Sequence, residues 1–111
     1  MENYIVVNQC LFVLMPKELD HHLTDQIRKE IDGYFITHPI RHVAFDFSKT
    51  EFIDSSGIGL IMGRYEKLHV AGGKIFVLGM LPAIRRVLTM SGIMKLVYIK
   101  ESERDVLTSV Q

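Results

Sequence analysis

The sequence lacks several features that would assign it at once to a specialised class of protein. Its 111 residues contain one cysteine, three prolines and no tryptophan. Because Cys10 is single, neither an internal disulfide nor a cysteine metal cluster is possible, and the apolar stretch CLFVLM around it predicts a buried, unreactive side chain. No apolar run reaches the roughly 18 residues of a membrane span, and the first residues lack the basic and apolar regions of a signal peptide. We therefore expect a cytoplasmic protein.

An excess of charge of one sign is also missing. Thirteen Lys and Arg residues balance thirteen Asp and Glu residues. Nucleic acids and anionic membranes attract proteins with a strongly basic surface, so we expect neither as a partner. The hydrophobic content of 48% and the chain length instead predict one compact domain over residues 1–111.

Apolar residues recur with the period of a strand in some segments and of a helix in others. Strands are expected within residues 4–15, 42–47, 74–80 and 95–100, and the first segment is expected to hold two strands joined by a tight turn at Asn8 and Gln9. Helices are expected between Asp20 and Pro39, along the apolar stripe 58–68, from Pro82 to Gly92, and from Ser102 onward. Strands that alternate with helices need crossover connections, which predicts an α/β fold with a largely parallel or mixed sheet.

The stretch DSSG at residues 54–57 directly precedes the second helical stripe. A Ser or Asp at this place caps the helix by accepting a hydrogen bond from a free N–H group of its first turn. The same helix terminus favours a phosphate, so Ser55 and Ser56 are also candidate phosphate acceptors. Gly57 and Gly59 carry no side chain and are expected to let the backbone of a partner approach the first turn.

Other chemistries fit the motifs less well. Neither serine has the G-x-S-x-G spacing of a hydrolase nucleophile, and the glycines at 57, 59 and 63 do not match the dinucleotide-binding or phosphate-loop spacings. Asp20, His21 and His22 are adjacent, but consecutive helical residues point in different directions and rarely bind one ion. We expect no catalytic residue, no metal site and no cofactor.

Four segments together resemble the bacterial anti-sigma factor antagonists of the STAS class. These are ELDHH at 18–22, IRHVAFDFS at 40–48, FIDSSGIGLIMGRY at 52–65 and PAIRRVLTMSGIMKLV at 82–97. ELDHH and GRY bring the resemblance closest to the sporulation branch of the class. It implies a single STAS-like α/β domain, with a small mixed sheet of four to five strands and about four helices packed mainly on one face.

The resemblance also implies a function without catalysis. Members of the class bind, in their unphosphorylated form, an anti-sigma factor that is also a serine kinase, and so release the sigma factor. The kinase then phosphorylates the antagonist, and a PP2C-type phosphatase restores it. The acceptor is the serine directly after the aspartate, which is Ser55 here, and Ser56 matches its unmodified neighbour. We expect the free protein to be a monomer.

The same resemblance implies a partner-binding surface around Ser55. Asp20 and Asp54 are expected at the same end of the sheet, where Asp54 orients the serine hydroxyl and Asp20 contacts the kinase. Each aspartate is alternatively only a helix cap. Arg64 lies off the apolar stripe and is expected to face the partner, whereas Tyr65 lies on the stripe and is expected in the core.

Lys17 departs from the pattern of this branch. Glycine usually stands at this position, before the glutamate that is Glu18 here. If the turn needed a positive φ angle, a lysine would force the kinase-facing loop to rearrange. The expected acceptor, Ser55, is not affected.

Two alternatives to this function stay open. The first is a STAS switch module of another pathway, such as the general stress response, which answers to a different kinase. The second is a nucleotide-binding or hydrolytic protein, which would need a phosphate loop or an activated serine that the motifs do not supply. ELDHH and GRY favour the sporulation branch over the first alternative.

Overall fold

The computed structural model describes residues 3–110. The strands are β1 (Tyr4–Val7), β2 (Cys10–Leu14), β3 (Glu18–Leu19), β4 (His42–Asp46), β5 (Phe52–Ile53), β6 (Ile75–Leu78) and β7 (Tyr98–Lys100). The helices are α1 (His21–Thr37), α2 (Ser55–His69), α3 (Pro82–Ser91) and α4 (Glu103–Ser109), with a short 3-10 helix η1 (Ile93–Lys95). Strands and helices alternate along most of the chain, as the sequence predicts.

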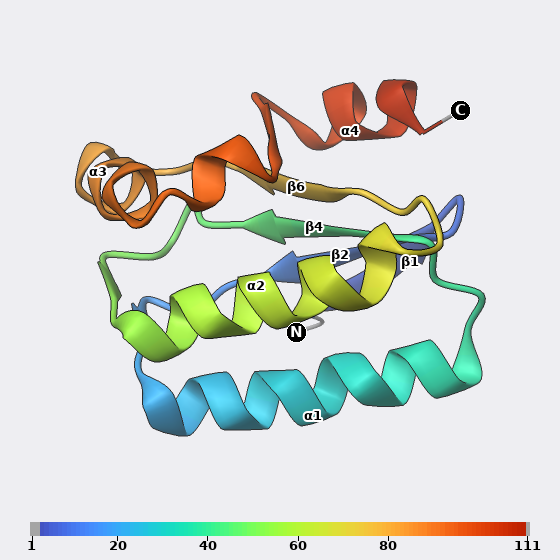
Figure 1. Cartoon of the computed structure of the whole chain (residues 1–111), viewed down its shortest axis with the longest axis horizontal. Helices are drawn as coiled ribbons and strands as arrows, with labels where there is room; N and C mark the ends of the chain where they lie inside the picture. The colour runs from blue at the N-terminus through green and yellow to red at the C-terminus, as the bar shows by residue number, and fades with distance from the viewer. Residues whose placement is uncertain (1–2, 111) are drawn as a thin grey trace.

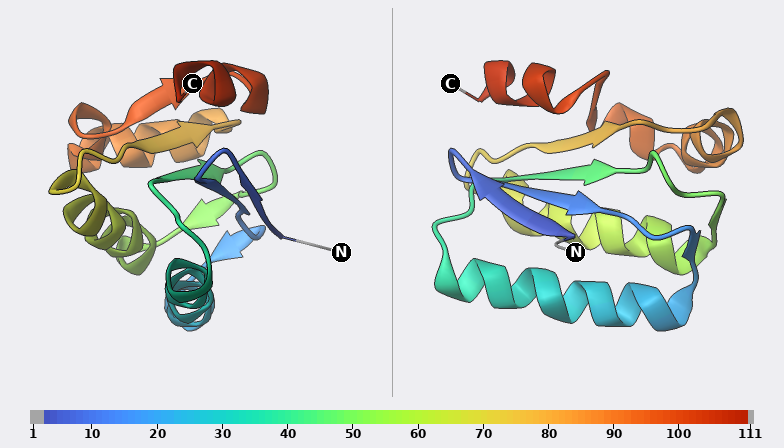
Figure 2. Two further views of the ribbon diagram at one scale, coloured as in Figure 1. Left: turned by 90° about the vertical axis from the view of Figure 1, so that its right-hand side faces the viewer. Right: turned by 180° about the vertical axis from the view of Figure 1, so that it is seen from behind.

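The main sheet is mixed and has five strands in the order β1-β2-β4-β6-β7. β1 pairs with β2 in the antiparallel sense, and every other neighbouring pair is parallel. Helices α1 and α2 lie on one face of the sheet and α4 lies on the other (Figures 1 and 2). The predicted mixed α/β sheet, with helices mainly on one face, is confirmed.

The first two strands form a hairpin with a two-residue turn. Asn8 and Gln9 both have positive φ angles, of 51° and 65°. A turn of this kind follows the natural twist of antiparallel strands, and asparagine adopts positive φ more readily than most residues. The hairpin predicted from residues 4–15 is confirmed.

The central strands are buried on both faces of the sheet. Along β6, Ile75 and Val77 join the large core beneath α1, α2 and α3, while Phe76 and Leu78 join a smaller cluster on the opposite face. This alternation follows from the two-residue period of a strand. The smaller cluster contains Cys10, so the predicted burial of this cysteine is confirmed, and the burial raises the pKa of its thiol to about 12.

Two details differ from the sequence-based prediction. The last strand begins at Tyr98 rather than at residue 95, because residues 93–95 form η1 and bury Ile93 in the core. The strands β3 and β5 form a separate two-stranded parallel sheet that was not predicted. Each strand has two residues, which is too short to show the alternation of apolar and polar residues that identifies a strand in a sequence.

Gly73 allows the chain between α2 and β6 to pass close to β4. A Cβ atom added at Gly73 would lie 2.1 Å from the carbonyl oxygen of Arg41 and 3.1 Å from Cβ of Leu68. The carbonyl belongs to the backbone, which cannot rotate away as the end of a long side chain can. Any side chain at this position therefore forces the two segments apart.

We expect Gly73→Ala to lower the free energy of unfolding by about 1–3 kcal/mol, because the added methyl group overlaps the Arg41 carbonyl. The matched control is Gly33→Ala, in the middle of α1, where an added Cβ would meet no atom within 4 Å. That change should raise stability by about 0.5–1 kcal/mol, since alanine is the better helix former. Urea unfolding measures both, and equal effects of the two substitutions would contradict the close approach.

Candidate functional site

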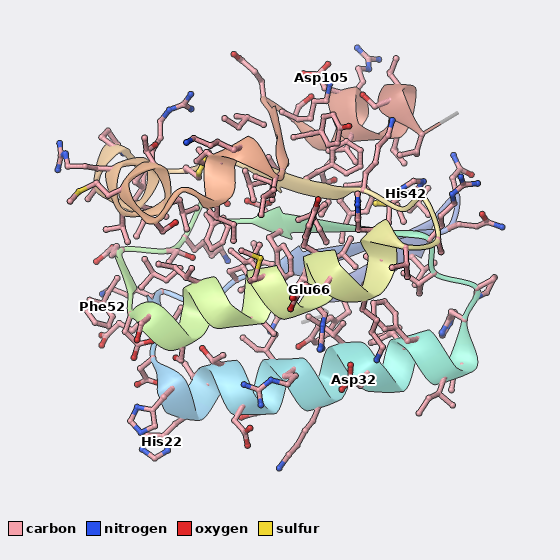
Figure 3. All side chains as sticks on the ribbon, in the orientation of Figure 1. His22, Asp32, His42, Phe52, Glu66 and Asp105 are labelled. Carbon is pink, nitrogen blue, oxygen red and sulfur yellow. The ribbon has the colours of Figure 1, made fainter. Side chains whose placement is uncertain are left out.

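The amino ends of α1 and α2 lie side by side, because each helix follows one strand of the two-stranded sheet. Leu19 of β3 is in register with Ile53 of β5, and the next residue in each segment is an aspartate. The N–H of Asp54 donates to the carbonyl of Leu19 over 3.2 Å. Both helices start at the same end of the molecule (Figures 1 and 3). The prediction that the ELDHH and DSSG turns share one end of the sheet is confirmed.

Asp20 and Asp54 are the N-caps of the two helices. The carboxylate of Asp20 accepts from the N–H of Leu23 over 3.0 Å, and that of Asp54 accepts from the N–H of Ser56 over 2.9 Å. Such a cap stabilises a helix by about 1 kcal/mol because it satisfies a free N–H group of the first turn. The capping predicted for both aspartates is confirmed.

The two adjacent serines have different environments. Ser55 is exposed at the first position of α2. Ser56 is partly buried, and its hydroxyl donates to the carboxylate of Asp54 and lies 3.2 Å from the hydroxyl of Thr24 on α1. Asp54 therefore holds the hydroxyl of Ser56, not that of Ser55 as the sequence analysis expected. The reason is the turn itself, which brings the second residue after the cap back over the carboxylate.

The pKa of Asp54 is lower than that of an ordinary aspartate. The largest cause is the hydrogen bond from the Ser56 hydroxyl. The N–H groups of Ser56 and Gly57 and the positive charge of His21 add to the effect, and partial desolvation opposes it. The carboxylate thus carries its negative charge at neutral pH, one residue away from Ser55.

Gly57 and Gly59 differ in the space around them. Gly57 is buried, and an added Cβ would lie 2.6 Å from Cγ1 of Ile53 and 2.8 Å from Cδ2 of Leu19. Gly57 therefore lets α2 pack on the β3–β5 pair, and the expectation that a partner approaches it is wrong. Gly59 is exposed, and no atom lies within 4 Å of an added Cβ. Its contact with a partner stays a prediction.

Arg64 is buried between the two long helices. Its Nη1 donates to Oδ1 of Asp32 on α1 over 2.8 Å, and only 11% of its side chain is exposed. The ammonium of Lys67 lies 3.6 Å from the same oxygen. The expectation that Arg64 faces a partner is therefore wrong. The buried stripe of α2 is Gly57, Leu60, Ile61, Arg64 and Leu68, which is rotated from the stripe chosen in the sequence.

The loop before β3 accepts Lys17 without backbone strain. Among residues 3–110, the non-glycine residues with positive φ are Asn8 and Gln9, so Lys17 does not need the glycine conformation. Its carbonyl accepts from the N–H groups of Glu51, over 2.7 Å, and Phe52, over 3.2 Å. Its ammonium also lies 3.8 Å from the carboxylate of Glu51. These contacts attach the loop to β5.

The sequence analysis missed two residues of the site. Thr24 is fully buried. Its position on the same buried stripe of α1 as Ile27 and Ile31 could have indicated this from the sequence. A hydroxyl on a buried stripe needs a polar partner, which is Ser56 here. Phe52 is 50% exposed at the start of β5, beside the two helix ends (Figure 3). An exposed phenylalanine next to an exposed serine is a candidate contact for a partner.

The two histidines next to Asp20 are exposed at the start of α1. The rings of His21 and His22 are 4.2 Å apart and both side chains are exposed. Within residues 3–110, no three His, Cys, Asp or Glu side chains gather where they could share a metal ion. The helices of the same region include none that is long and apolar enough to cross a membrane.

Comparison with known proteins places these features in a family. The family model described as "STAS domain" matches residues 3–106. The chain is 35% identical over 101 residues to an anti-sigma F factor antagonist of Paenibacillus polymyxa, which covers 91% of this chain and 86% of that protein. A second anti-sigma F factor antagonist, from Lysinibacillus sphaericus, is 30% identical and covers 80% of this chain and 76% of that protein.

Solved structures share the same fold. The anti-sigma factor antagonist SpoIIAA in its unphosphorylated form has a TM-score of 0.83 and 28% identity, and covers 96% of this chain and 91% of that chain. The phosphorylated form of the Bacillus cell fate determinant SpoIIAA has a TM-score of 0.75 and 28% identity, and covers 96% of both chains. A Moorella thermoacetica RsbS variant, at 17% identity, a TM-score of 0.80 and coverage of 96% and 92%, shares the fold. The chain belongs to the STAS domain family, and the two curated relatives described above are anti-sigma F factor antagonists.

Proposed function

We propose that this protein is an anti-sigma factor antagonist that is switched by phosphorylation of Ser55. In its unphosphorylated form it binds an anti-sigma factor that is also a serine kinase, and the sigma factor is released. Phosphorylation ends this binding, and a PP2C-type phosphatase restores it. One observation carries the proposal: of the two adjacent serines at the start of α2, Ser55 is exposed, whereas the hydroxyl of Ser56 is bound within the protein.

Accessibility of the hydroxyl favours Ser55 as the acceptor. A kinase must place the γ-phosphate of ATP in line with a free hydroxyl. Ser56 would first have to break its hydrogen bond to Asp54 and leave its place beside Thr24. Ser55 needs no such rearrangement, because its side chain is already exposed at the helix end.

A phosphate on Ser55 is compatible with the fold. It adds about 1.5–2 negative charges at neutral pH, and the amino end of α2 provides free N–H groups and the positive end of the helix dipole. The related SpoIIAA has been solved in both forms, and each matches 96% of this chain. These observations support a switch that is a local change of charge on an intact domain.

The same phosphate is suited to release a partner. With the ionised carboxylate of Asp54 beside it and Asp20 at the neighbouring helix end, it makes this end of the molecule acidic, so that it repels acidic groups which the partner presents to Ser55. Two unit charges about 6 Å apart interact by roughly 1–3 kcal/mol at effective dielectric constants between those of water and a protein surface. Two such repulsions across an interface weaken binding about 100-fold.

Sequence identity to known proteins favours an anti-sigma F factor antagonist over a STAS module of the stress response. Two curated relatives, at 35% and 30% identity, are anti-sigma F factor antagonists, whereas the likeness to RsbS, at 17% identity, extends to the fold alone. We propose a regulatory role rather than catalysis, with Ser55 as a substrate of another enzyme. Tight, saturable binding of nucleotide to the isolated protein would instead favour the nucleotide-binding alternative.

We expect the anti-sigma kinase of the same organism, with ATP, to phosphorylate Ser55. Ser55→Ala should abolish incorporation of phosphate, and Ser56→Ala should leave phosphate on Ser55, because only the hydroxyl of Ser55 is free. Mass spectrometry locates the phosphate. Phosphate on Ser56 of the unsubstituted protein, or none under conditions where the kinase is active, would contradict the assignment.

The same two variants test the geometry without a kinase. Ser56→Ala should lower the free energy of unfolding by about 1 kcal/mol, because it removes the hydrogen bonds to Asp54 and Thr24. Ser55→Ala should change it by less than about 0.5 kcal/mol, as is usual at an exposed position. Urea unfolding measures both values, and a larger loss with Ser55→Ala would show that the serine roles are reversed.

Phosphorylation should weaken binding to the anti-sigma factor about 100-fold at low salt without unfolding the domain. If repulsion between charges is the cause, the loss should shrink as ionic strength rises from about 0.01 M to about 1 M, where the Debye length falls from about 30 Å to about 3 Å. Calorimetric titration of the two forms measures the effect. A loss that is independent of salt would assign release to steric exclusion and overturn the electrostatic explanation.

A further inference from the structure

One edge of the main sheet is suited to accept another strand. β1 is the outermost strand, and within residues 3–110 it pairs with β2 alone (Figure 2). Its sequence, YIVV, contains none of the charged residues or prolines with which natural edge strands prevent further pairing. The opposite edge strand, β7, ends in Lys100, which is a residue of that kind. The edge of β1 is therefore the less protected of the two.

The hairpin geometry determines which backbone groups of β1 point away from the sheet. Facing residues of an antiparallel pair alternate between those that exchange hydrogen bonds and those that do not. The N–H of Leu14 donates to the carbonyl of Asn3 over 2.8 Å, so these two residues form a bonded pair. The adjacent pair, Tyr4 with Val13, is therefore of the other kind, and so is Val6 two residues further on. The N–H and C=O groups of Tyr4 and Val6 thus point toward the free edge.

On the face of the sheet that carries α1, β1 borders a pocket of about 430 Å³. The hydroxyl of Tyr4 donates to Oε1 of Glu30 on α1 over 2.5 Å, and the ring of Tyr4 stacks on that of Tyr34 with centroids 5.2 Å apart. These contacts hold three of the lining side chains together on one side of the sheet. The pocket thus combines aromatic surface with one carboxylate.

On the opposite face, β1 borders a second pocket, of about 160 Å³. Ile5 is 56% exposed, and it is in register with Phe12 of β2. Leu14 is in register with Asp46 of β4 and, two residues after Phe12, lies on the same face of the sheet. Glu103 begins α4, the helix on this face (Figure 2). All five residues line the pocket, so it has an apolar floor and two carboxylates.

The charge around both pockets is of one sign. Glu30 lines the first pocket, Asp46 and Glu103 line the second, and the described residues of the two linings include no Lys or Arg. The lysine and the arginine that precede Glu30 on α1 both pair with Asp25. Long basic side chains complement such surfaces, because their apolar stems cover the floor while their charged ends meet the carboxylates.

We propose that the edge of β1 binds an extended basic segment of another protein, which adds one strand to the main sheet. The outward groups of Tyr4 and Val6 supply the main-chain hydrogen bonds. Consecutive side chains of the added strand point to opposite faces, so basic residues reach Glu30 on one face and Glu103 on the other. This surface is separate from the turn at Ser55 and does not rest on the proposed function.

The test is hydrogen exchange of the full chain, labelled with nitrogen-15 and observed by NMR, with the acetylated and amidated peptide TKVKVKT. In the free protein, the N–H groups of Ile5 and Val7 should exchange more slowly than those of Tyr4 and Val6, which point outward. With the peptide at about ten times its Kd, exchange at Tyr4 and Val6 should slow about tenfold. Saturable binding without slower exchange at these two residues would overturn the added strand.

Two control peptides separate the two sources of affinity. An analogue of TKVKVKT with methylated backbone nitrogens keeps the charges but loses the main-chain donors, and TEVEVET reverses the charges. Each should bind at least about tenfold more weakly. Equal binding of the methylated analogue would overturn the added strand, and equal binding of TEVEVET would overturn the charge complementarity. Slower exchange at Tyr4 and Val6 on concentrating the protein alone would assign the edge to a second copy and overturn the peptide partner.

Substitution of the carboxylates provides the last arm of the test. Glu30→Gln and Glu103→Gln should each weaken binding of TKVKVKT about two- to fivefold, the usual range for an exposed ion pair. The control is Asp25→Asn on α1, which changes the charge equally outside both pockets and should leave the affinity unchanged. Equal weakening by all three variants would mean non-specific attraction and overturn the site. The two pocket variants lie on different helices, so loss of folding in one leaves the other decisive.

Discussion

The short parallel pairing of β3 with β5 is the constraint on which the candidate site depends. It places Leu19 beside Ile53, and the two N-cap aspartates therefore begin α1 and α2 at the same point. Gly57 makes this possible, because a side chain there would overlap both strands. Once the two helix ends are adjacent, Thr24 lies within reach of Ser56, and Ser55 is left as the exposed hydroxyl of the turn.

The contact between α1 and α2 is maintained by a charged pair as well as by apolar packing. Arg64 and Asp32 join the helices away from the switch, and Lys67 adds a second positive charge to the same carboxylate. Because only 11% of the Arg64 side chain is exposed, against 41% of that of Asp32, removing Asp32 leaves a largely buried guanidinium without this partner, which costs more than losing an exposed pair. The charged pair thus adds to the apolar packing that holds the two helices together.

The direction of the strands separates the molecule into two chemically different ends. The carboxyl ends of β3 and β5 lead into Asp20 and Asp54, and the amino ends of β4, β6 and β7 follow Arg41, Lys74 and Lys95. Because like ends of parallel strands lie at one edge, residues far apart in the sequence add their charges there. A chain with no net charge thus carries two aspartate caps at one end and three basic residues near the other.

Local signals in the sequence determined most of the elements, and tertiary contacts decided the roles of the site residues. The turn at Asn8 and Gln9 and the aspartate caps follow from interactions within a few residues, so they were predicted correctly. The sequence analysis placed most of the buried stripe of α2 one residue too late in the chain. Because each residue turns a helix by about 100°, Arg64 was therefore assigned to the surface. Which serine is free depends on Thr24, 32 residues away, a contact that only the folded chain creates.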